Sequence, residues 1–294
     1  MKVLVTGSSG MLGSEVLCSL NNRGDAGTAF DRVTFLRAES TERSSMLDGF
    51  DVVIHAAANT NVEQCELMSE ASYRDNCFLT EQLFRYARRH GVKFVFISST
   101  GVYGRGKSSP YHEYDAVSPT TVYHRSKLMA EQTVLTCADT LVVRAGWLFG
   151  GRIDNPKNFV ANRLKEIQAV NGSITANSGQ IGSPTYVRDC ARMLLELISD
   201  DCMGIYNVVN EGSASRYEYV KQIVELSGAP IDVQPIDACA FKRHADVSEN
   251  EAAVSYRMRF EERPPLRPWQ DALADYMIDA GLVGMREPHS LNPS

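Results

Sequence analysis

Residues 2–13 read KVLVTGSSGMLG, an apolar run that passes directly into a glycine-rich loop. A continuous run such as Lys2–Thr6 is typical of a strand that is buried on both faces of a parallel sheet. Apolar residues then recur at helical spacing over Met11–Asn21, which predicts a helix immediately after the loop. A strand, a glycine-rich turn and a helix in this order indicate an α/β fold that begins with a phosphate-binding turn.

The loop carries Gly7, Gly10 and Gly13 with the spacing GxxGxxG. The first glycine permits a tight turn, the second lets a pyrophosphate approach the backbone, and the third lets the helix pack closely on the sheet. Free N–H groups at the start of the helix would face the phosphates. We therefore predict a dinucleotide site, with a purely structural turn as the alternative.

Two side chains after the next expected strand, residues 27–30, bear on the choice of dinucleotide. Asp31 follows that strand and could accept hydrogen bonds from the adenosine ribose hydroxyls. Arg32 could instead pair with a 2′-phosphate. The two residues favour opposite cofactors, so the prediction is NADP or NAD, with a surface turn as the alternative role of both.

The first half of the chain continues the alternation of strands and helices. We expect strands at 51–55, 93–98 and 141–144 and helices at 70–90 and 122–136. Such βαβ repetition is typical of a doubly wound parallel sheet. We therefore predict a Rossmann dinucleotide-binding domain over residues 1–147, rejoined by parts of 185–210.

The pattern changes after Trp147, where glycine, asparagine and proline become frequent. We expect a smaller α+β substrate-binding part that comprises residues 148–184 and 211–294. Its expected elements are helices near 159–168, 216–226 and 268–280, while 228–265 reads as irregular. A helix at 185–197 and a strand at 205–209 would rejoin the first domain.

Composition excludes several classes of protein. The chain has 294 residues and a formal net charge of −6, and no apolar run approaches the roughly 20 residues of a membrane span. Mild acidity argues against nucleic acid, which needs clustered lysine and arginine. The cysteines are scattered without zinc-type spacing, which predicts reduced thiols in a cytoplasmic protein and no metal site. They are Cys18, Cys65, Cys77, Cys137, Cys190, Cys202 and Cys239.

Tyr123 and Lys127 stand one helical turn apart on the expected helix 122–136. A nearby ammonium would lower the pKa of the tyrosine, and the lysine could also hold the nicotinamide ribose. Ser99 ends the preceding strand and could donate a hydrogen bond to a substrate carbonyl. Hydride from the cofactor and a proton from Tyr123 would then reduce a ketone. A helix-surface pair and a strand-end cap are the structural alternatives.

These elements resemble an extended short-chain dehydrogenase/reductase. The shared segments are GSSGMLG, VIHAAA at 53–58, FISSTGVYG at 96–104 and SPTTVYHRSKLMAE at 118–131. GQIGSPTYVRD at 179–189 and GIYNVVNEGSASRYE at 204–218 are similar, more narrowly, to the dTDP-4-dehydrorhamnose reductase family. The resemblance implies an NAD(P)H-dependent 4-ketoreductase whose substrate is a nucleotide-activated deoxysugar.

The resemblance also implies roles for particular residues. Counting back from Tyr103 assigns Ser99 as the catalytic hydroxyl, in agreement with the choice made from the strand end. Gly10, Met11 and Leu12 would lie along the cofactor pyrophosphate, and Ala58, Asn59 and Thr60 would line the cofactor. The positions that would face the sugar nucleotide are Thr60, Val62, Thr100 and Trp147; a core aromatic is the alternative role of Trp147.

Several positions depart from the family pattern. His124 stands where glycine usually follows the catalytic tyrosine, and Thr100-Gly101 stands where an acid often follows the catalytic hydroxyl. The usual Arg-Pro-x-Asn-Ser segment is represented only by EAAVSY at 251–256. Glu63 and Glu66 match an acidic stretch that binds a divalent ion in some relatives, with a solvated helix start as the alternative.

Two rival functions stay open at this point. An epimerase of the same fold would retain its cofactor through the reaction. A non-catalytic, NADP-binding regulatory subunit would resemble the methionine adenosyltransferase beta subunit. The resemblance implies a nucleotide-sugar partner, and the composition argues against nucleic-acid and membrane partners. The oligomeric state stays open, with a homodimer among the alternatives.

Overall fold

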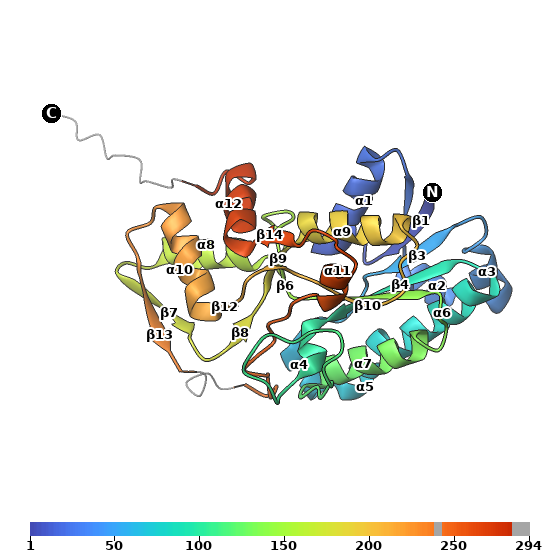
Figure 1. The fold of residues 1–294 in the computed structure, drawn as a ribbon, viewed down its shortest axis with the longest axis horizontal. Helices are drawn as coiled ribbons and strands as arrows, with labels where there is room; N and C mark the ends of the chain where they lie inside the picture. The colour runs from blue at the N-terminus through green and yellow to red at the C-terminus, as the bar shows by residue number, and fades with distance from the viewer. Residues whose placement is uncertain (238–242, 284–294) are drawn as a thin grey trace.

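The computed structural model describes residues 1–237 and 243–283. Its centre is a six-stranded parallel sheet with the strand order β10-β5-β4-β3-β1-β2 (Figure 1). The predicted doubly wound sheet is therefore confirmed. The strands are β1 (Lys2–Thr6), β2 (Ala26–Phe30), β3 (Val52–His55), β4 (Lys93–Ser99), β5 (Thr140–Ala145) and β10 (Gly204–Val208).

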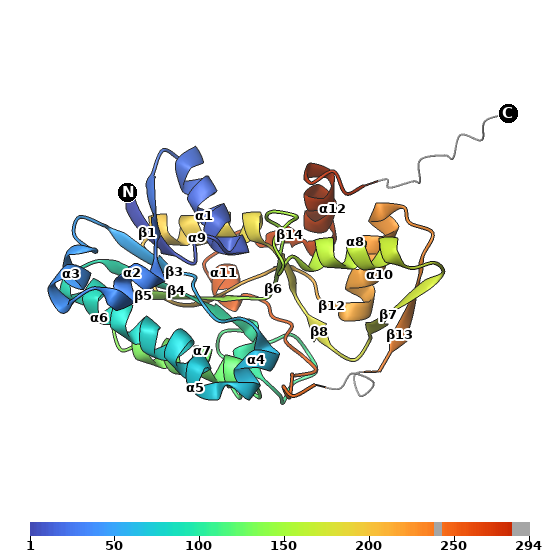
Figure 2. The same cartoon turned by 180° about the vertical axis from the view of Figure 1, so that it is seen from behind.

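Helices cover both faces of this sheet. Helices α1 (Met11–Asn22) and α9 (Val187–Ser199) lie on one face, and α6 (Leu79–Arg89) and α7 (Val122–Val134) lie on the other, as Figures 1 and 2 show. Because successive strand residues point to opposite faces, Val3 and Val5 join one hydrophobic cluster while Leu4 joins the other. This explains the continuous apolar run of β1.

The strand order reverses between β1 and β3, since β2 lies on one side of β1 and the later strands lie on the other. In an open α/β sheet, such a switch point opens a crevice at the carboxyl ends of the strands. The expected dinucleotide site therefore belongs at the ends of β1 and β3.

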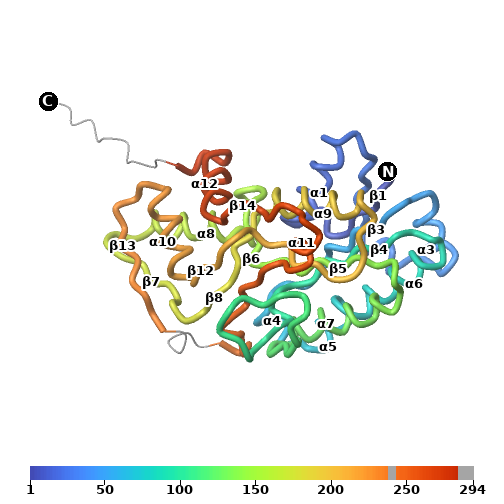
Figure 3. The backbone as a smooth tube through the Cα atoms, viewed as in Figure 1, coloured from blue at the N-terminus to red at the C-terminus, as the bar shows by residue number. Residues whose placement is uncertain are grey.

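The second half of the molecule contains helices and short two-stranded sheets, with the chain leaving the main sheet at β6 and returning with α9 (Figure 3). The helices are α8 (Phe159–Ala169), α10 (Arg216–Ser227) and α12 (Trp269–Asp279). The paired strands are β6 (Trp147–Phe149) with β9 (Pro184–Tyr186), β7 (Ser173–Asn177) with β13 (Asp232–Ile236), β8 (Ile181–Gly182) with β12 (Ala214–Ser215), and β11 (Asn210–Glu211) with β14 (Leu266–Pro268). The domain boundary at residue 147 stays a proposal.

The structure corrects two expectations about local structure and adds short helices that the sequence did not predict. The stretch 228–265 is not irregular throughout, because it contains β13 and α11 (Tyr256–Phe260). Strand β13 forms by pairing with β7, about 60 residues earlier in the sequence, and its own residues DVQPI have little strand character. The expected helix 70–90 is divided into α5 (Ser69–Tyr73), a π-helical turn (Arg74–Phe78) and α6. The segment 31–67 also contains three short helices: α2 (Arg32–Arg37), α3 (Ser40–Ser45) and α4 (Val62–Leu67).

The cysteines fit the expectation of free thiols wherever the structure describes them. Cys18, Cys65, Cys77, Cys137, Cys190 and Cys202 form no disulfide, and Cys239 lies outside the described residues. Within residues 1–237 and 243–283, no helix has both the length and the apolar character needed to cross a bilayer. The cytoplasmic location stays a prediction.

A buried histidine ties the ends of β1 and β3 to the layer of helices. The hydroxyl of Thr80 donates to the Asn76 carbonyl at 2.7 Å, so it accepts from His55 Nε2 at 3.0 Å. His55 Nδ1 therefore accepts from the Thr6 hydroxyl at 2.7 Å, and Thr6 Oγ1 accepts the Ala57 N–H at 3.1 Å. Burial, with a contribution from the Lys127 charge, lowers the pKa of His55 to about 3, so the ring is neutral at pH 7.

We expect the stability of the protein to fall as the pH is lowered from about 6.5 toward 3, because the unfolded histidine binds a proton there and the folded one does not. Equilibrium denaturation above and below about pH 6 should show a steeper loss in the wild type than in His55→Gln. The excess slope should not exceed about 1.4 kcal/mol per pH unit. Equal pH dependence of the two proteins would contradict the neutral, bonded histidine.

Candidate active site

The glycine turn after β1 packs its backbone against the end of β3. Gly7 has φ +67°, and a Cβ there would lie 2.7 Å from the Ala57 nitrogen. A Cβ on Gly13 would lie 2.2 Å from the Gly7 carbonyl oxygen. Only glycine fits either position. The turn thereby directs the start of α1 toward the switch point of the sheet.

The first turn of α1 presents open backbone donors. Gly10 precedes the helix, and no side chain caps it. The first N–H groups of a helix have no partner within the helix, so they attract an anion. Met11 lies beside Gly151, whose added Cβ would be 3.6 Å from the Met11 Cα, whereas the Leu12 side chain is buried in the core. The turn therefore suits a pyrophosphate.

Asp31 and Arg32 follow β2, and each has a protein partner. Asp31 caps α2: its carboxylate accepts from the Thr34 hydroxyl at 2.6 Å and from the Thr34 and Val33 N–H groups. The Thr34 hydroxyl bond is the largest cause of a lowered pKa of Asp31. Arg32 lies 3.5 Å from an Asp75 oxygen. Their contact with a ribose or a 2′-phosphate stays a prediction.

The segment after β3 is tied to α7 through an asparagine that the sequence analysis missed. The Asn76 side chain accepts from the Asn59 N–H at 2.7 Å and donates to the Asn59 carbonyl at 3.1 Å. Its amide nitrogen also donates to the Ser126 hydroxyl at 3.1 Å, and Ser126 donates to the Tyr123 carbonyl at 2.7 Å. Asn76 falls in the π-helical turn, which no local pattern predicts.

The other predicted residues of this segment are only partly covered by the protein. Ala58 is half-buried, Thr60 is exposed, and Val62 is the half-buried first residue of α4. The Thr60 hydroxyl accepts from Lys157 Nζ at 2.7 Å, so a loop of the second half of the molecule reaches the segment. Cofactor and substrate contacts of these residues stay predictions.

Polar contacts fix the start of helix α7, which carries Tyr123 and Lys127. Thr121 caps the helix, and Glu66 Oε1 accepts from the Val122 N–H at 2.6 Å. Lys127 is 2% exposed, with Nζ 4.0 Å from the centre of the Phe96 ring of β4. Among the described residues, none accepts a hydrogen bond from this ammonium. The three donors of the ammonium are therefore available to a ligand.

The pKa values of this pair differ from the sequence expectation. Burial raises the pKa of Tyr123 above its ordinary value, and the charges of Cys65 and Glu251 add to this effect. Burial lowers the pKa of Lys127 to about 7 against the opposing charge of Glu131. The expected lowering of the tyrosine pKa by the lysine is therefore wrong for the protein alone, because loss of hydration dominates. Tyr123 is protonated at neutral pH.

Ser99 ends strand β4 and Thr100 begins the 3-10 turn that follows it, and both elements contact α7. Ser99 Oγ accepts from the Gly101 N–H at 3.2 Å and caps the following turn. A hydroxyl that accepts a backbone bond still has its own hydrogen to donate. Thr100 is buried. Ser99 therefore serves both as a strand-end cap and as an available donor.

The two unusual residues of the sequence, Gly101 and His124, contact each other. A Cβ added to Gly101 would lie 2.1 Å from Cε1 and Nε2 of His124. The His124 ring is buried, with Nδ1 3.0 Å from the Thr121 hydroxyl. The absence of a side chain at 101 thus makes room for the imidazole at 124. The two departures form a single packing unit.

Trp147 occupies β6 at the start of the second half. Its Nε1 donates to Glu251 Oε2 at 2.8 Å, and the Arg216 guanidinium lies 3.4 Å from the ring centre. A Cβ on Gly182 would overlap the indole at 2.1 Å. Glu251 and Arg216 were not among the predicted site residues, and the only sequence signal was that 251–256 departs from the family segment.

The acidic pair considered for a divalent ion has other partners. Glu63 Oε2 accepts from the backbone of His244 and Ala245, at 2.8 and 3.2 Å, and Glu66 caps α7 as described above. Within the described part of the chain, no group of three or more His, Cys, Asp and Glu residues could hold a metal ion. Both glutamates therefore act as backbone acceptors.

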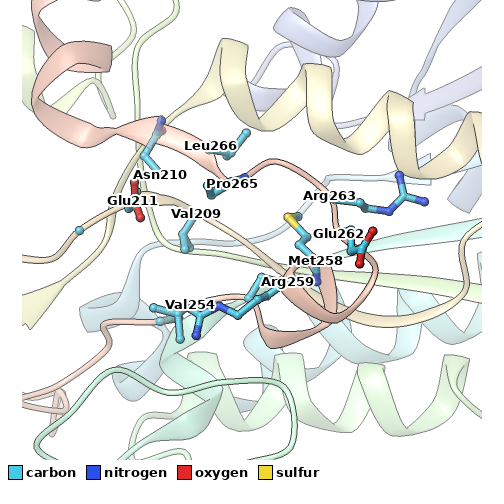
Figure 4. Close-up of a pocket in the computed structure, with 13 residues that line it drawn as sticks. Val209, Asn210, Glu211, Val254, Met258, Arg259, Glu262, Arg263, Pro265 and Leu266 are labelled. Atoms are coloured by element: carbon cyan, nitrogen blue, oxygen red, sulfur yellow. Dashed lines mark hydrogen bonds between the residues drawn. The ribbon is translucent and has the colours of Figure 1, made fainter.

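A separate cavity of about 360 Å³ lies between β11, α11 and the segment 262–266 (Figure 4). Its walls include apolar Val209, Met258 and Leu266 together with Arg259 and Glu262. None of the residues predicted from sequence lines it. The candidate site is instead at the carboxyl ends of β1, β3, β4 and β5.

The parallel sheet, the uncapped helix after a glycine turn and the serine, tyrosine and lysine near the strand ends define an extended short-chain dehydrogenase/reductase. Within that class, the family model described as the RmlD substrate binding domain matches residues 1–281, and the chain belongs to that family.

Individual relatives span almost the whole chain. The spore coat polysaccharide biosynthesis protein SpsK of Bacillus subtilis is 31% identical over 94% of this chain and 96% of its own length. The dTDP-4-dehydrorhamnose reductase of Mycobacterium tuberculosis is 31% identical over 93% of this chain and 91% of its own length. A dTDP-4-dehydrorhamnose reductase structure from Bacillus anthracis, in complex with NADP, has a TM-score of 0.88 and 27% identity, covering 95% of this chain and 100% of that one.

The packing of Gly101 against His124 can be tested by a double-mutant cycle. Gly101→Ala should destabilise the protein by about 1–3 kcal/mol, because its methyl group meets a buried ring. Gly101→Ala/His124→Ala should recover much of that loss, since the ring is then absent. Denaturation of the four proteins measures the coupling. Additive effects would mean that the two positions do not share one space.

Proposed function

We propose that this protein is a reductase of the 4-keto group of a nucleotide-activated deoxyhexose, acting as dTDP-4-dehydrorhamnose reductase does. The observation that carries the proposal is the buried Lys127 side chain, to which the described residues offer no hydrogen-bond acceptor, one helical turn from Tyr123 and beside Phe96 of β4. The named relatives support the same substrate class.

The cofactor in this proposal is NADP or NAD, and the complex of the Bacillus anthracis relative with NADP favours NADP. The start of α1, with Gly10, Met11 and Leu12, would hold the pyrophosphate. Lys127 would donate to a ribose hydroxyl, which supplies the missing acceptor. When bound, the nicotinamide supplies the hydride. Arg32, whose side chain is 45% exposed, is free enough to turn toward a 2′-phosphate.

The chain's own groups then handle the carbonyl. Ser99 would donate its hydrogen to the ketone oxygen, which favours the negative charge that develops there. Tyr123 is protonated at neutral pH and can give its proton to the new alkoxide. The protonated state of Tyr123 therefore suits the direction of reduction.

Tyr123→Phe should lose at least about 10²-fold in turnover, because the proton donor is removed while the ring remains. The assay follows NADPH consumption at 340 nm with dTDP-4-keto-6-deoxyhexose as the substrate. Tyr114→Phe, at an exposed tyrosine, is the matched control and should be fully active. Undiminished turnover in Tyr123→Phe would remove the acid role. Turnover without added NADPH would instead favour an epimerase.

We also expect kcat/KM for NADPH to fall as the pH rises through about 7, where free Lys127 loses its proton. The reason is that a neutral amine binds the ribose more weakly than an ammonium. Lys127→Met should have a low kcat/KM for NADPH at every pH and should not show this decline. Lys165→Met, on an exposed face of α8, should keep the wild-type profile. A wild-type profile that is flat between about pH 6 and 8 would contradict this role.

A further inference from the structure

Glu251 is a buried carboxylate that has one oxygen without a partner. The residue is 6% exposed. Its Oε2 accepts from the Trp147 indole at 2.8 Å, whereas no described residue donates a hydrogen bond to its Oε1. An ionised carboxylate is an acceptor at both oxygens, and leaving a charged acceptor unpaired in the interior is costly. The arrangement is explained if a ligand supplies the second donor.

The backbone around Glu251 holds this side chain in a fixed position. The Glu251 N–H donates to the Ile181 carbonyl at 2.8 Å, and the Ile181 N–H donates to the Glu249 carbonyl at 2.7 Å. On the other side, the Tyr111 N–H donates to the Ala252 carbonyl at 2.8 Å. The segment is thus bonded to two different parts of the chain. A site prepared in this way avoids the entropy of ordering a loop on binding.

The surroundings of the carboxylate belong to the proposed site. Burial raises the pKa of Tyr123 and lowers the pKa of His124, and the charge of Glu251 adds a smaller upward contribution to both. The same charge also acts on Arg216, whose guanidinium lies on the Trp147 ring. The described residues include no ion pair between Glu251 and Arg216 and no acceptor of a hydrogen bond from the Arg216 side chain. A carboxylate with one unused oxygen and a guanidinium therefore stand beside the same indole.

We propose that Glu251 is a substrate-specificity residue whose Oε1 accepts a hydrogen bond from a hydroxyl of the sugar ring, with Trp147 holding the carboxylate in place through Oε2. This inference rests on the proposed function for the identity of the sugar nucleotide. The neighbouring Arg216 cation balances the carboxylate charge, which favours a neutral hydroxyl over an ammonium as the donor. Glu251 then selects sugars that carry the hydroxyl.

Glu251→Gln tests the assignment, because the amide keeps an acceptor for the indole and loses the charge of the second oxygen. We expect KM for the keto sugar to rise about 10- to 100-fold, as for a lost hydrogen bond to a charged group. The value of kcat and the Kd for NADPH should change less than about threefold. Glu249→Gln, two residues away and exposed, is the matched control and should behave as the wild type.

Analogues that lack the C2 or the C3 hydroxyl separate recognition from a structural role. On one of these analogues, the KM of the wild type should rise by about the same factor as the KM of Glu251→Gln rises on the full substrate. Removing the same hydroxyl should leave the KM of the variant unchanged. Equal losses on every analogue, or an unchanged KM in Glu251→Gln with the wild-type melting temperature, would overturn the assignment.

Calorimetric binding of dTDP-rhamnose separates this inference from the proposed function. If the wild type binds this nucleotide sugar and Glu251→Gln binds it at least about tenfold more weakly, the inference stands even without turnover of the keto sugar. If the two proteins bind it equally, Glu251 is not a recognition residue, whatever reaction the wild type performs. If the wild type binds no dTDP sugar, both proposals fail.

Discussion

The burial of the Lys127 ammonium is the constraint on which the arrangement of this molecule depends. Removing such a charge from water costs several kcal/mol unless neighbouring groups compensate. The compensation here is partial: the Phe96 ring face lies at 4.0 Å, and Glu131 acts from a distance while it is itself paired with Arg144 through two hydrogen bonds. The pKa of the lysine consequently falls to about 7. Core packing alone would not favour this residue, so the cost is best explained by a ligand.

Two titratable groups near Lys127, His55 and Tyr123, are held in their uncharged forms. A second cation next to Lys127 would be repelled, and His55 is held neutral by burial and by its two hydrogen bonds. Tyr123 is kept protonated. Polar contacts from distant segments, such as Glu66 at the start of α7 and Asn76 beneath it, fix the helix that carries both catalytic candidates. The site is therefore prepared by many bonds of long sequence separation.

Local sequence patterns predicted the elements that depend on residues close together in the sequence. The strand before the glycine turn, the helix after it and the i, i+4 pair on α7 follow from burial and helical spacing, and each lies within a residue or two of its expected bounds. The features that the sequence did not predict depend on partners that lie far away in the sequence. Strand β13 exists because β7 pairs with it, and Glu251 meets Trp147 across 104 positions. The tyrosine pKa was mispredicted because spacing shows that a lysine is near but not that both groups lose their water.

The departures from the family pattern are concentrated on one side of the site. The glycine turn, Ser99, Tyr123 and Lys127 follow the pattern, and these are the residues proposed to meet the cofactor and the reacting carbonyl. Gly101, His124 and Glu251 do not follow it. The His124 ring fills the space beside Gly101 and contacts the Tyr123 ring. Glu251 accepts a hydrogen bond from Trp147. Hydride chemistry needs the same groups for any ketone, whereas the shape and polarity around the sugar decide which ketone enters. The departures therefore fall on residues that would shape the substrate pocket under the proposed function, whereas the proposed reacting groups keep the family pattern.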